Sequence, residues 1–116
     1  MCHVLIIEDE PLIALSIEAV LEDEGVDSID IAATEDQAIR LARNRRPSLI
    51  TSDVKLAKGN GPAAVAQILR DLGPVPVIFI TATPEDCERC SPPAIVLGKP
   101  FRPGQIAAAF HKLVAR

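Results

Sequence analysis

Short apolar runs alternate along the chain with longer segments in which apolar residues recur three and four positions apart. The short runs are rich in Val, Ile and Leu and contain little polar alternation. Such runs are typical of strands that are buried on both faces of a parallel sheet. We therefore predict five strands, at residues 3–7, 27–32, 49–51, 75–80 and 94–97.

The segments between the predicted strands have the apolar periodicity of helices. In the first of them, Leu12, Leu15 and Ala19 would lie on one helical face. Proline is favoured in the first turn of a helix, and it stands where three of the helices should begin, at Pro11, Pro62 and Pro103. The alternation predicts an α/β fold of the flavodoxin-like, doubly wound type, with a five-stranded parallel sheet in the order 2-1-3-4-5. We expect residues 1–116 to form this single domain.

One interval departs from the alternation. Only twelve residues separate Thr81 from Ala94, and three of them are prolines. Proline in the interior of a helix removes a hydrogen bond and clashes with the preceding turn. The fourth helix should therefore be shortened or irregular, with one or two turns over residues 85–90, or it should be absent.

Composition and charge narrow the class of protein. The 116 residues carry a net charge of -4, which argues against a direct nucleic-acid partner, because phosphate backbones select basic surfaces. No apolar run approaches the roughly 20 residues that span a bilayer, and no basic segment precedes an apolar core at the N-terminus. The chain has an odd number of cysteines, three, and no recognisable secretion signal, which indicates a reducing compartment. We expect a cytoplasmic protein that binds neither nucleic acid nor membranes.

The polar residues at the carboxyl ends of the predicted strands are the candidate site, because ligands bind at this edge of open parallel sheets. The first strand is followed by Glu8 and Asp9, the third by Asp53, the fourth by Thr81 and the fifth by Lys99. Three carboxylates in one crevice repel each other unless a cation lies among them, and oxygen ligands of this kind suit Mg²⁺. With an ammonium group and a hydroxyl beside them, they are typical of a phosphoryl-transfer site.

Four segments resemble the signatures of response-regulator receiver domains, the phosphoaccepting modules of two-component regulatory systems. They occur in the order of that family and near its usual spacing, and the resemblance covers the whole chain. The segments are residues 6–11 (IIEDEP), 52–56 (SDVKL), 79–82 (FITA) and 99–101 (KPF). Within the family, residues 8–14 and 76–82 are most similar to receivers of the sigma-factor-mimic regulators of the alphaproteobacterial general stress response.

The resemblance implies a division of roles within the acidic cluster. Glu8 and Asp9 would be the acidic pair that serves Mg²⁺, with Asp9 the more direct ligand. Asp53 would share the metal, and Lys55 would supply its backbone carbonyl oxygen. Asp53 would also be the phosphoacceptor that becomes an aspartyl phosphate.

The resemblance also implies how the phosphoryl group arrives and is held. A histidine kinase or histidine phosphotransferase would donate it, as in a phosphorelay. Thr81 and Lys99 would bind the phosphoryl oxygens, and the Lys99–Pro100 peptide would be cis. The domain would take part in its own phosphorylation and dephosphorylation only, so we do not expect an enzyme with a separate substrate.

The output of the domain is less typical of the family. Many receivers have Tyr or Phe three residues before the lysine that corresponds to Lys99, whereas this chain has Val96. Because no ring is present there to change its rotamer, we expect phosphorylation to act chiefly by reordering residues 83–93. A downstream protein target would bind the face formed by strands four and five and the last helix.

Two other functions stay open on the sequence alone. A pseudo-receiver would have the same fold and signal without phosphate; such proteins usually lack the phosphoacceptor, the acidic pair or the lysine, and this chain retains them all. A metal-dependent phosphatase would have a second acid two residues after its nucleophile, where this chain has Lys55. Cys87 and Cys90 form a C-x-x-C without a second cysteine pair, so we interpret them as surface or half-buried thiols rather than a redox or zinc site.

Overall fold

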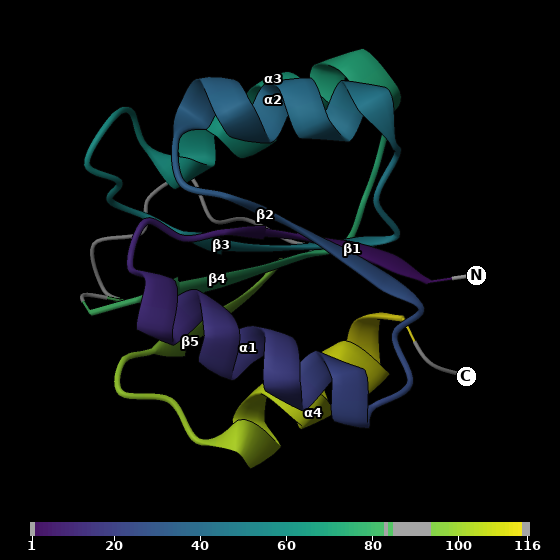
Figure 1. The fold of residues 1–116 in the computed structure, drawn as a ribbon, viewed down its shortest axis with the longest axis vertical. Helices are drawn as coiled ribbons and strands as arrows, with labels where there is room; N and C mark the ends of the chain where they lie inside the picture. Colours follow the sequence, from purple (N-terminus) through teal and green to yellow (C-terminus); the bar gives the residue numbers. More distant parts are fainter. Residues whose placement is uncertain (1, 83, 85–93, 115–116) are drawn as a thin grey trace.

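The structure is a computed structural model that describes residues 2–82, 84 and 94–114. Within these residues, five strands and four helices are found (Figure 1). The strands are β1 (His3–Ile7), β2 (Ser28–Ala32), β3 (Leu49–Asp53), β4 (Val77–Thr81) and β5 (Ala94–Gly98). The helices are α1 (Pro11–Asp23), α2 (Glu35–Asn44), α3 (Gly61–Leu72) and α4 (Pro103–Leu113). None of these four helices is both long enough and apolar enough to cross a membrane.

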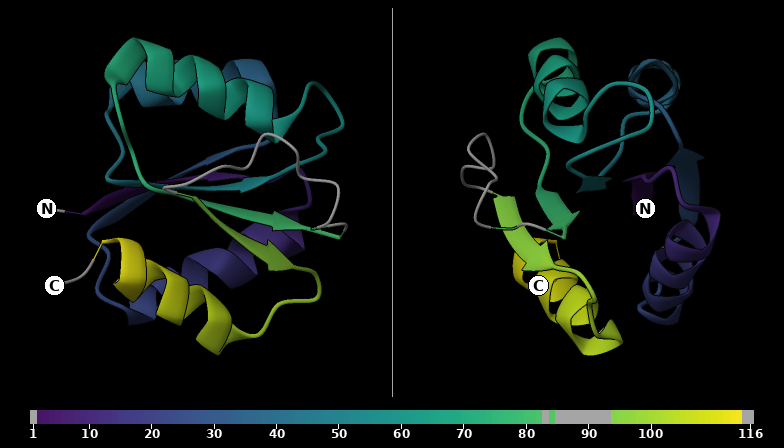
Figure 2. Two further views of the ribbon diagram at one scale, coloured as in Figure 1. Left: turned by 180° about the vertical axis from the view of Figure 1, so that it is seen from behind. Right: turned by 90° about the vertical axis from the view of Figure 1, so that its left-hand side faces the viewer.

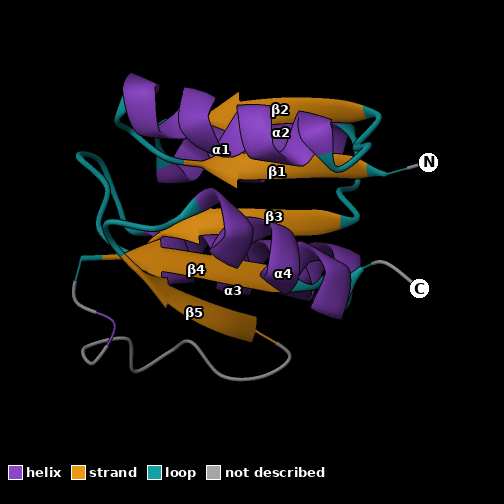
Figure 3. Ribbon diagram, turned by 90° about the horizontal axis from the view of Figure 1, so that it is seen from below, coloured by secondary structure: helices purple, strands orange, loops and turns teal. Residues whose placement is uncertain are grey.

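The strands form one parallel sheet in the order β2-β1-β3-β4-β5 (Figure 3). Helices α2 and α3 cover one face of the sheet, and α1 and α4 cover the other (Figure 1 and Figure 2). Parallel strands need crossover connections, and helical crossovers on both sides produce this three-layer arrangement. The predicted flavodoxin-like, doubly wound α/β fold is confirmed.

The core is divided by the sheet into two apolar layers. Along β1, Leu5 and Ile7 pack on the side of α2 and α3, whereas Val4 and Ile6 pack on the side of α1 and α4. Each of these four side chains is at most 1% exposed, and full burial of a side chain of this size contributes about 1.5–3 kcal/mol. In a strand buried on both faces, apolar side chains are favoured on both sides, which explains the apolar run at residues 4–7.

The register of the sheet brings the strand ends together at one edge. Ile7 at the end of β1 lies opposite Ser52 of β3, so that the next residues, Glu8 and Asp53, come level with each other. Strands β4 and β5 also end at paired residues. Polar side chains that begin where the apolar runs end are therefore gathered at a single edge.

Strands β3 and β4 differ from their predicted bounds. β3 continues past residue 51 to Asp53, because the backbone of Ser52 and Asp53 still pairs with the neighbouring strands. Ladder hydrogen bonds use only backbone groups, so polar side chains do not end a strand. β4 begins at Val77, after Pro76, which has no N–H group to donate to a ladder. The predicted fourth-helix interval, both cysteines of the C-x-x-C and the rest of residues 83–93 except Pro84 lie outside the described residues.

Thr51 of β3 is a polar exception inside the apolar layer. Its side chain is fully buried, and its neighbours in the register are Ile6 of β1 and Ile78 of β4. Within the part of the chain that the structure describes, its Oγ1 atom has no hydrogen-bond partner. A buried hydroxyl without a partner costs about 1–3 kcal/mol of desolvation free energy.

We predict that Thr51→Val raises the free energy of unfolding by roughly 1 kcal/mol, because valine keeps the shape and removes the unpaired hydroxyl. Urea unfolding followed by far-UV circular dichroism measures the change. The matched control is Ser52→Ala on the same strand, because the buried Ser52 hydroxyl donates to the Asp53 carbonyl oxygen at 2.8 Å. That control should lower the stability, and a loss of stability in both variants would contradict the prediction.

Candidate functional site

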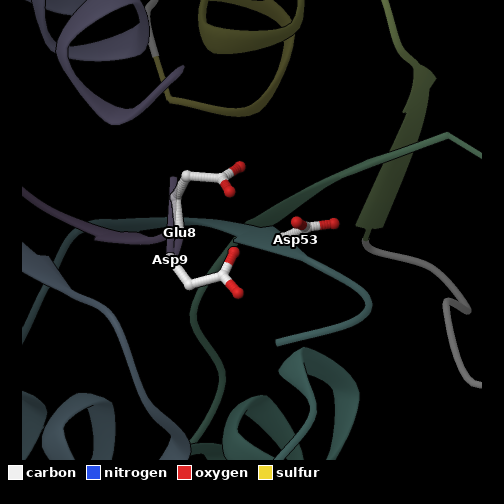
Figure 4. Close-up of side chains that lie close together, drawn as sticks. All are labelled: Glu8, Asp9 and Asp53. Carbon is white, nitrogen blue, oxygen red and sulfur yellow. The ribbon is translucent and has the colours of Figure 1, made fainter. Parts of the chain in front are cut away.

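Three carboxylates meet at the carboxyl edge of the sheet. Glu8 and Asp9 follow β1, and Asp53 is the last residue of β3. One oxygen of each can be chosen so that all three lie within 4.8 Å of one another. Figure 4 shows the three side chains around one space. The structure thus brings together three of the residues that the sequence predicted for a metal site.

Lys99, one residue after β5, supplies a positive charge to this cluster. Its Nζ atom donates to Glu8 Oε1 at 3.2 Å and to Asp53 Oδ2 at 3.0 Å. The side chains of Glu8, Asp53 and Lys99 are only 1%, 11% and 16% exposed. Water therefore screens these charges weakly, and their mutual interactions are stronger than at an open surface.

The surroundings displace two protonation equilibria. Burial, and after it the Asp53 charge, raise the pKa of Glu8 to about 7 against the opposing effects of the Glu10 N–H group and Lys99. Burial alone would lower the pKa of Lys99, but its hydrogen bond to Asp53 and the Glu8 and Asp53 charges raise it overall. The ammonium group therefore stays charged, while Glu8 changes between its protonated and ionised forms near neutral pH. One lysine does not neutralise three crowded carboxylates.

Backbone N–H groups fix the direction of each carboxylate. Val54 N donates to Asp53 Oδ1 at 2.8 Å, and Glu10 N donates to Glu8 Oε2 at 3.2 Å. Asp9 is held from a distant segment, because the Ala57 N–H group donates to Asp9 Oδ2 at 2.7 Å. These donors orient the carboxylate oxygens of the cluster.

Gly61 allows α3 to begin against the end of β3. A Cβ atom at this position would lie 1.7 Å from the Asp53 carbonyl oxygen and 2.4 Å from Ser52 Oγ. The Gly61 N–H group donates to the Val54 carbonyl oxygen at 2.9 Å, which ties the helix start to the residue after Asp53. The sequence analysis missed this residue, although the G-N-G-P run at residues 59–62 was its signal.

The remaining predicted site residues lie at the same edge. Thr81 ends β4 and is 3% exposed, and its carbonyl oxygen accepts from the Lys99 N–H group at 2.8 Å. The predicted cis peptide at Lys99–Pro100 is confirmed. Lys55 is exposed in the segment that follows β3, where its backbone pairs with Asn60 in an isolated bridge. The roles assigned to these residues stay predictions.

Comparison with known proteins identifies relatives along nearly the whole chain. The family model described as response regulator receiver domain matches residues 4–111. The Phyllosphere-induced regulator PhyR of Methylorubrum extorquens is 46% identical over 115 residues, which cover 95% of this chain and 42% of that protein. The chain spans about half the length of the curated relatives it matches, with 42%, 51% and 49% of three of them covered.

Solved structures agree with these relatives. The response regulator PhyR from Brucella abortus superimposes with a TM-score of 0.87 at 39% identity, covering 97% of this chain and 47% of that one. The PhyR receiver domain of Erythrobacter litoralis superimposes with a TM-score of 0.86 at 36% identity, and the match covers 97% of this chain and 88% of that one. Another PhyR structure, described as a stress response regulator, has a TM-score of 0.81 at 42% identity. This match covers 97% of this chain and 45% of that one. The predicted similarity to receivers of stress-response regulators is confirmed.

We predict that the metal-free protein loses stability through Glu8 as the pH rises. The folded state holds the Glu8 proton up to a pKa of about 7, whereas the unfolded chain releases it near the ordinary value of about 4.3. Between these values the folded state binds more protons, so the free energy of unfolding falls with rising pH. Glu8→Gln removes this contribution and should therefore stabilise the protein more at pH 8 than at pH 5.

Urea unfolding at the two pH values, without divalent cations, measures the difference. We expect it to be on the order of 1 kcal/mol, since partial solvent screening reduces the full effect of the shift. Glu22→Gln, on the exposed side of α1, serves as the control for loss of one acidic charge. If Glu8→Gln raised the free energy of unfolding equally at both pH values, the raised pKa of Glu8 would be contradicted.

Proposed function

The chain belongs to the family of response regulator receiver domains, and on that premise we propose that Asp53 accepts a phosphoryl group from a histidine kinase or histidine phosphotransferase. The observation that carries the proposal is the convergence of Glu8, Asp9, Asp53 and Lys99 in one weakly solvated cluster. Receiver domains are signalling domains, and in this proposal residues 1–116 form one such domain that acts in the cytoplasm by a change of conformation.

The donor set fits Mg²⁺, which receiver domains generally bind at an acidic pocket. The cluster offers carboxylate oxygens only, which is the chemistry that hard cations prefer. Glu8, Asp9 and Asp53 would hold the ion together with the backbone carbonyl oxygen of Lys55. When bound, Mg²⁺ supplies positive charge that offsets the carboxylates and polarises a phosphoryl oxygen.

The contacts of Asp53 support its proposed role as the nucleophile. Its Oδ1 atom accepts from Val54 N–H and its Oδ2 atom from Lys99 Nζ, so the carboxylate is fixed in direction. In the transfer, a bond forms between a carboxylate oxygen and phosphorus, the phosphorus–nitrogen bond of the donor histidine breaks, and the imidazole keeps the electron pair. The Lys99 ammonium group and the Thr81 hydroxyl would then bind phosphoryl oxygens through charge-assisted hydrogen bonds.

Two grooves support the proposed protein partners. A groove of about 530 Å³ adjoins the site, because Lys99 lines it together with residues of α1 and of the segment that leads into α4. On the same helix, Leu12 and Leu15 are 80% and 53% exposed, an apolar surface suited to the phosphodonor protein. A second groove of about 310 Å³ lies between β5 and α4, on the face proposed for the downstream target.

One observation favours the alternative of a pseudo-receiver. Lys99 already pairs with both Glu8 and Asp53, so the cluster has an internal counter-charge without any phosphoryl group. A domain of this kind would signal through its surface alone. The two functions are distinguished by whether the protein accepts a phosphoryl group.

We predict that a small phosphodonor such as acetyl phosphate, given with Mg²⁺, adds one phosphoryl group to the protein and none to Asp53→Asn. The amide is a far weaker nucleophile than the carboxylate, so no acyl phosphate can form at that position. Intact mass spectrometry, with hydroxylamine sensitivity of the adduct, measures the result. Asp36→Asn on the exposed start of α2 is the control and should still be modified. An unmodified wild-type protein, with this donor and with a kinase, would favour the pseudo-receiver.

We predict that Asp9→Asn weakens Mg²⁺ binding at least tenfold, since it replaces a charged ligand by a neutral one. The chain has no Trp or Tyr, so binding is best measured by calorimetry or by amide NMR shifts. Glu10→Gln is a matched control, because this exposed acid is adjacent in sequence but outside the cluster. Unchanged Mg²⁺ affinity in Asp9→Asn would refute the assignment of Asp9 as a ligand.

A further inference from the structure

Glu35, the first residue of α2, contacts a segment that is distant in sequence, the loop of residues 54–60 between β3 and α3, here called the β3–α3 loop. The Glu35 N–H group donates to the Lys58 carbonyl oxygen at 3.2 Å. The Glu35 carboxylate accepts, through Oε1, from the Asn60 N–H group at 3.1 Å. The backbone and the side chain of one residue therefore hold the loop on both sides of Gly59.

Gly59 gives Glu35 the room for this double contact. A Cβ atom at Gly59 would lie 2.4 Å from Glu35 Oε1 and 2.5 Å from Glu35 Cβ. Gly59 also has a φ of +89°, a conformation that favours glycine. The side chain of Glu35 thus occupies the space that any other residue at position 59 would need.

The start of α2 is itself firmly anchored. Thr34 caps the helix, since its Oγ1 atom accepts from Gln37 N at 3.1 Å. The Gln37 side chain in turn accepts from Ala33 N at 2.8 Å, directly after β2. Glu35 therefore contacts the loop from a position fixed relative to the sheet.

The β3–α3 loop is part of the acidic site. It begins directly after Asp53, and its Ala57 N–H group holds Asp9 Oδ2 at 2.7 Å. At its other end, Asn60 caps α3 by accepting from Ala63 N at 2.7 Å. The position of the loop therefore determines where the Asp9 carboxylate points.

We propose that Glu35 is a positioning residue of the acidic site, which holds the β3–α3 loop so that the Ala57 N–H group fixes the Asp9 carboxylate. Glu35 acts through hydrogen bonds, so its oxygen matters and its negative charge does not. The effect on the loop is independent of phosphate and metal. The effect on Mg²⁺ affinity rests on the proposed function.

Three variants of the 116-residue chain test the proposal. Glu35→Ala removes the acceptor, and Glu35→Gln keeps an acceptor oxygen without the charge. Asp36→Ala removes a neighbouring charge of α2 that, among the described residues, forms no hydrogen bond or ion pair with the loop. The first measurement is amide NMR of the metal-free protein, with the shift and the hydrogen-exchange rate of Ala57. The second is titration with Mg²⁺ alone.

In Glu35→Ala we expect Ala57 exchange to be roughly threefold to tenfold faster and Mg²⁺ affinity to be roughly tenfold lower, the size typical for residues that orient a metal ligand. Glu35→Gln and Asp36→Ala should remain close to the wild type in both measurements. Unchanged Ala57 exchange in Glu35→Ala overturns the proposal, as does an equal effect of Glu35→Gln or of Asp36→Ala.

The two measurements distinguish failure of the proposal from failure of the proposed function. If the wild-type protein binds no Mg²⁺ and accepts no phosphoryl group, the proposed function fails, while the Ala57 amide still reports whether Glu35 holds the loop. If Glu35→Ala is too unstable to measure, the comparison passes to Glu35→Gln and Glu35→Asp. Glutamine should preserve the Ala57 amide, whereas the shorter aspartate should not reach Asn60, and equal spectra for these two variants would overturn the proposal.

Discussion

The site depends on the ion pairs that the Lys99 ammonium group forms with both Glu8 and Asp53. Charges with so little exposure lose most of their hydration, and the structure is stable only where opposite charges and hydrogen bonds compensate that loss. Lys99 follows β5, yet its ammonium group reaches across the end of β4 to residues of β3 and β1. The strand order, the common register and the alignment of the strand ends must all be correct for this contact to form.

The parallel sheet meets this requirement because the charged residues of the site follow the apolar runs and therefore lie at one edge of the sheet. Along residues 4–7 of β1, both faces are filled by apolar side chains, and the first carboxylate appears only at Glu8, where the strand has ended. The close approach of α3 at Gly61 and the N–H groups after Asp53 then provide donors beside the carboxylates. The apolar layers thus determine where the charged groups lie, and the backbone at the strand ends determines their direction.

Much of this could be predicted from the sequence, and the reason for the remainder is physical. The strands follow from apolar runs, and Glu8, Asp9, Asp53 and Lys99 follow from their place after those runs. The contacts of Ala57 with Asp9 and of Asn60 with Glu35 join residues 48 and 25 positions apart through backbone N–H groups. Every residue except proline has such a group, so no residue type marks these contacts, and only the folded path of the loop reveals them.

The charge balance of the site also constrains how it can change. Without a ligand, the same ammonium group serves two carboxylates, and the pKa of about 7 for Glu8 shows that this compensation is incomplete. An aspartyl phosphate would carry about two negative charges where the carboxylate carries one. If Lys99 turned to the phosphoryl oxygens, Glu8 would lose its partner and would need a proton or a divalent cation instead. In the proposed function, phosphorylation and cation binding would therefore be coupled through the charges of Glu8 and Lys99, and a change of conformation would start from the redistribution of the Lys99 contacts.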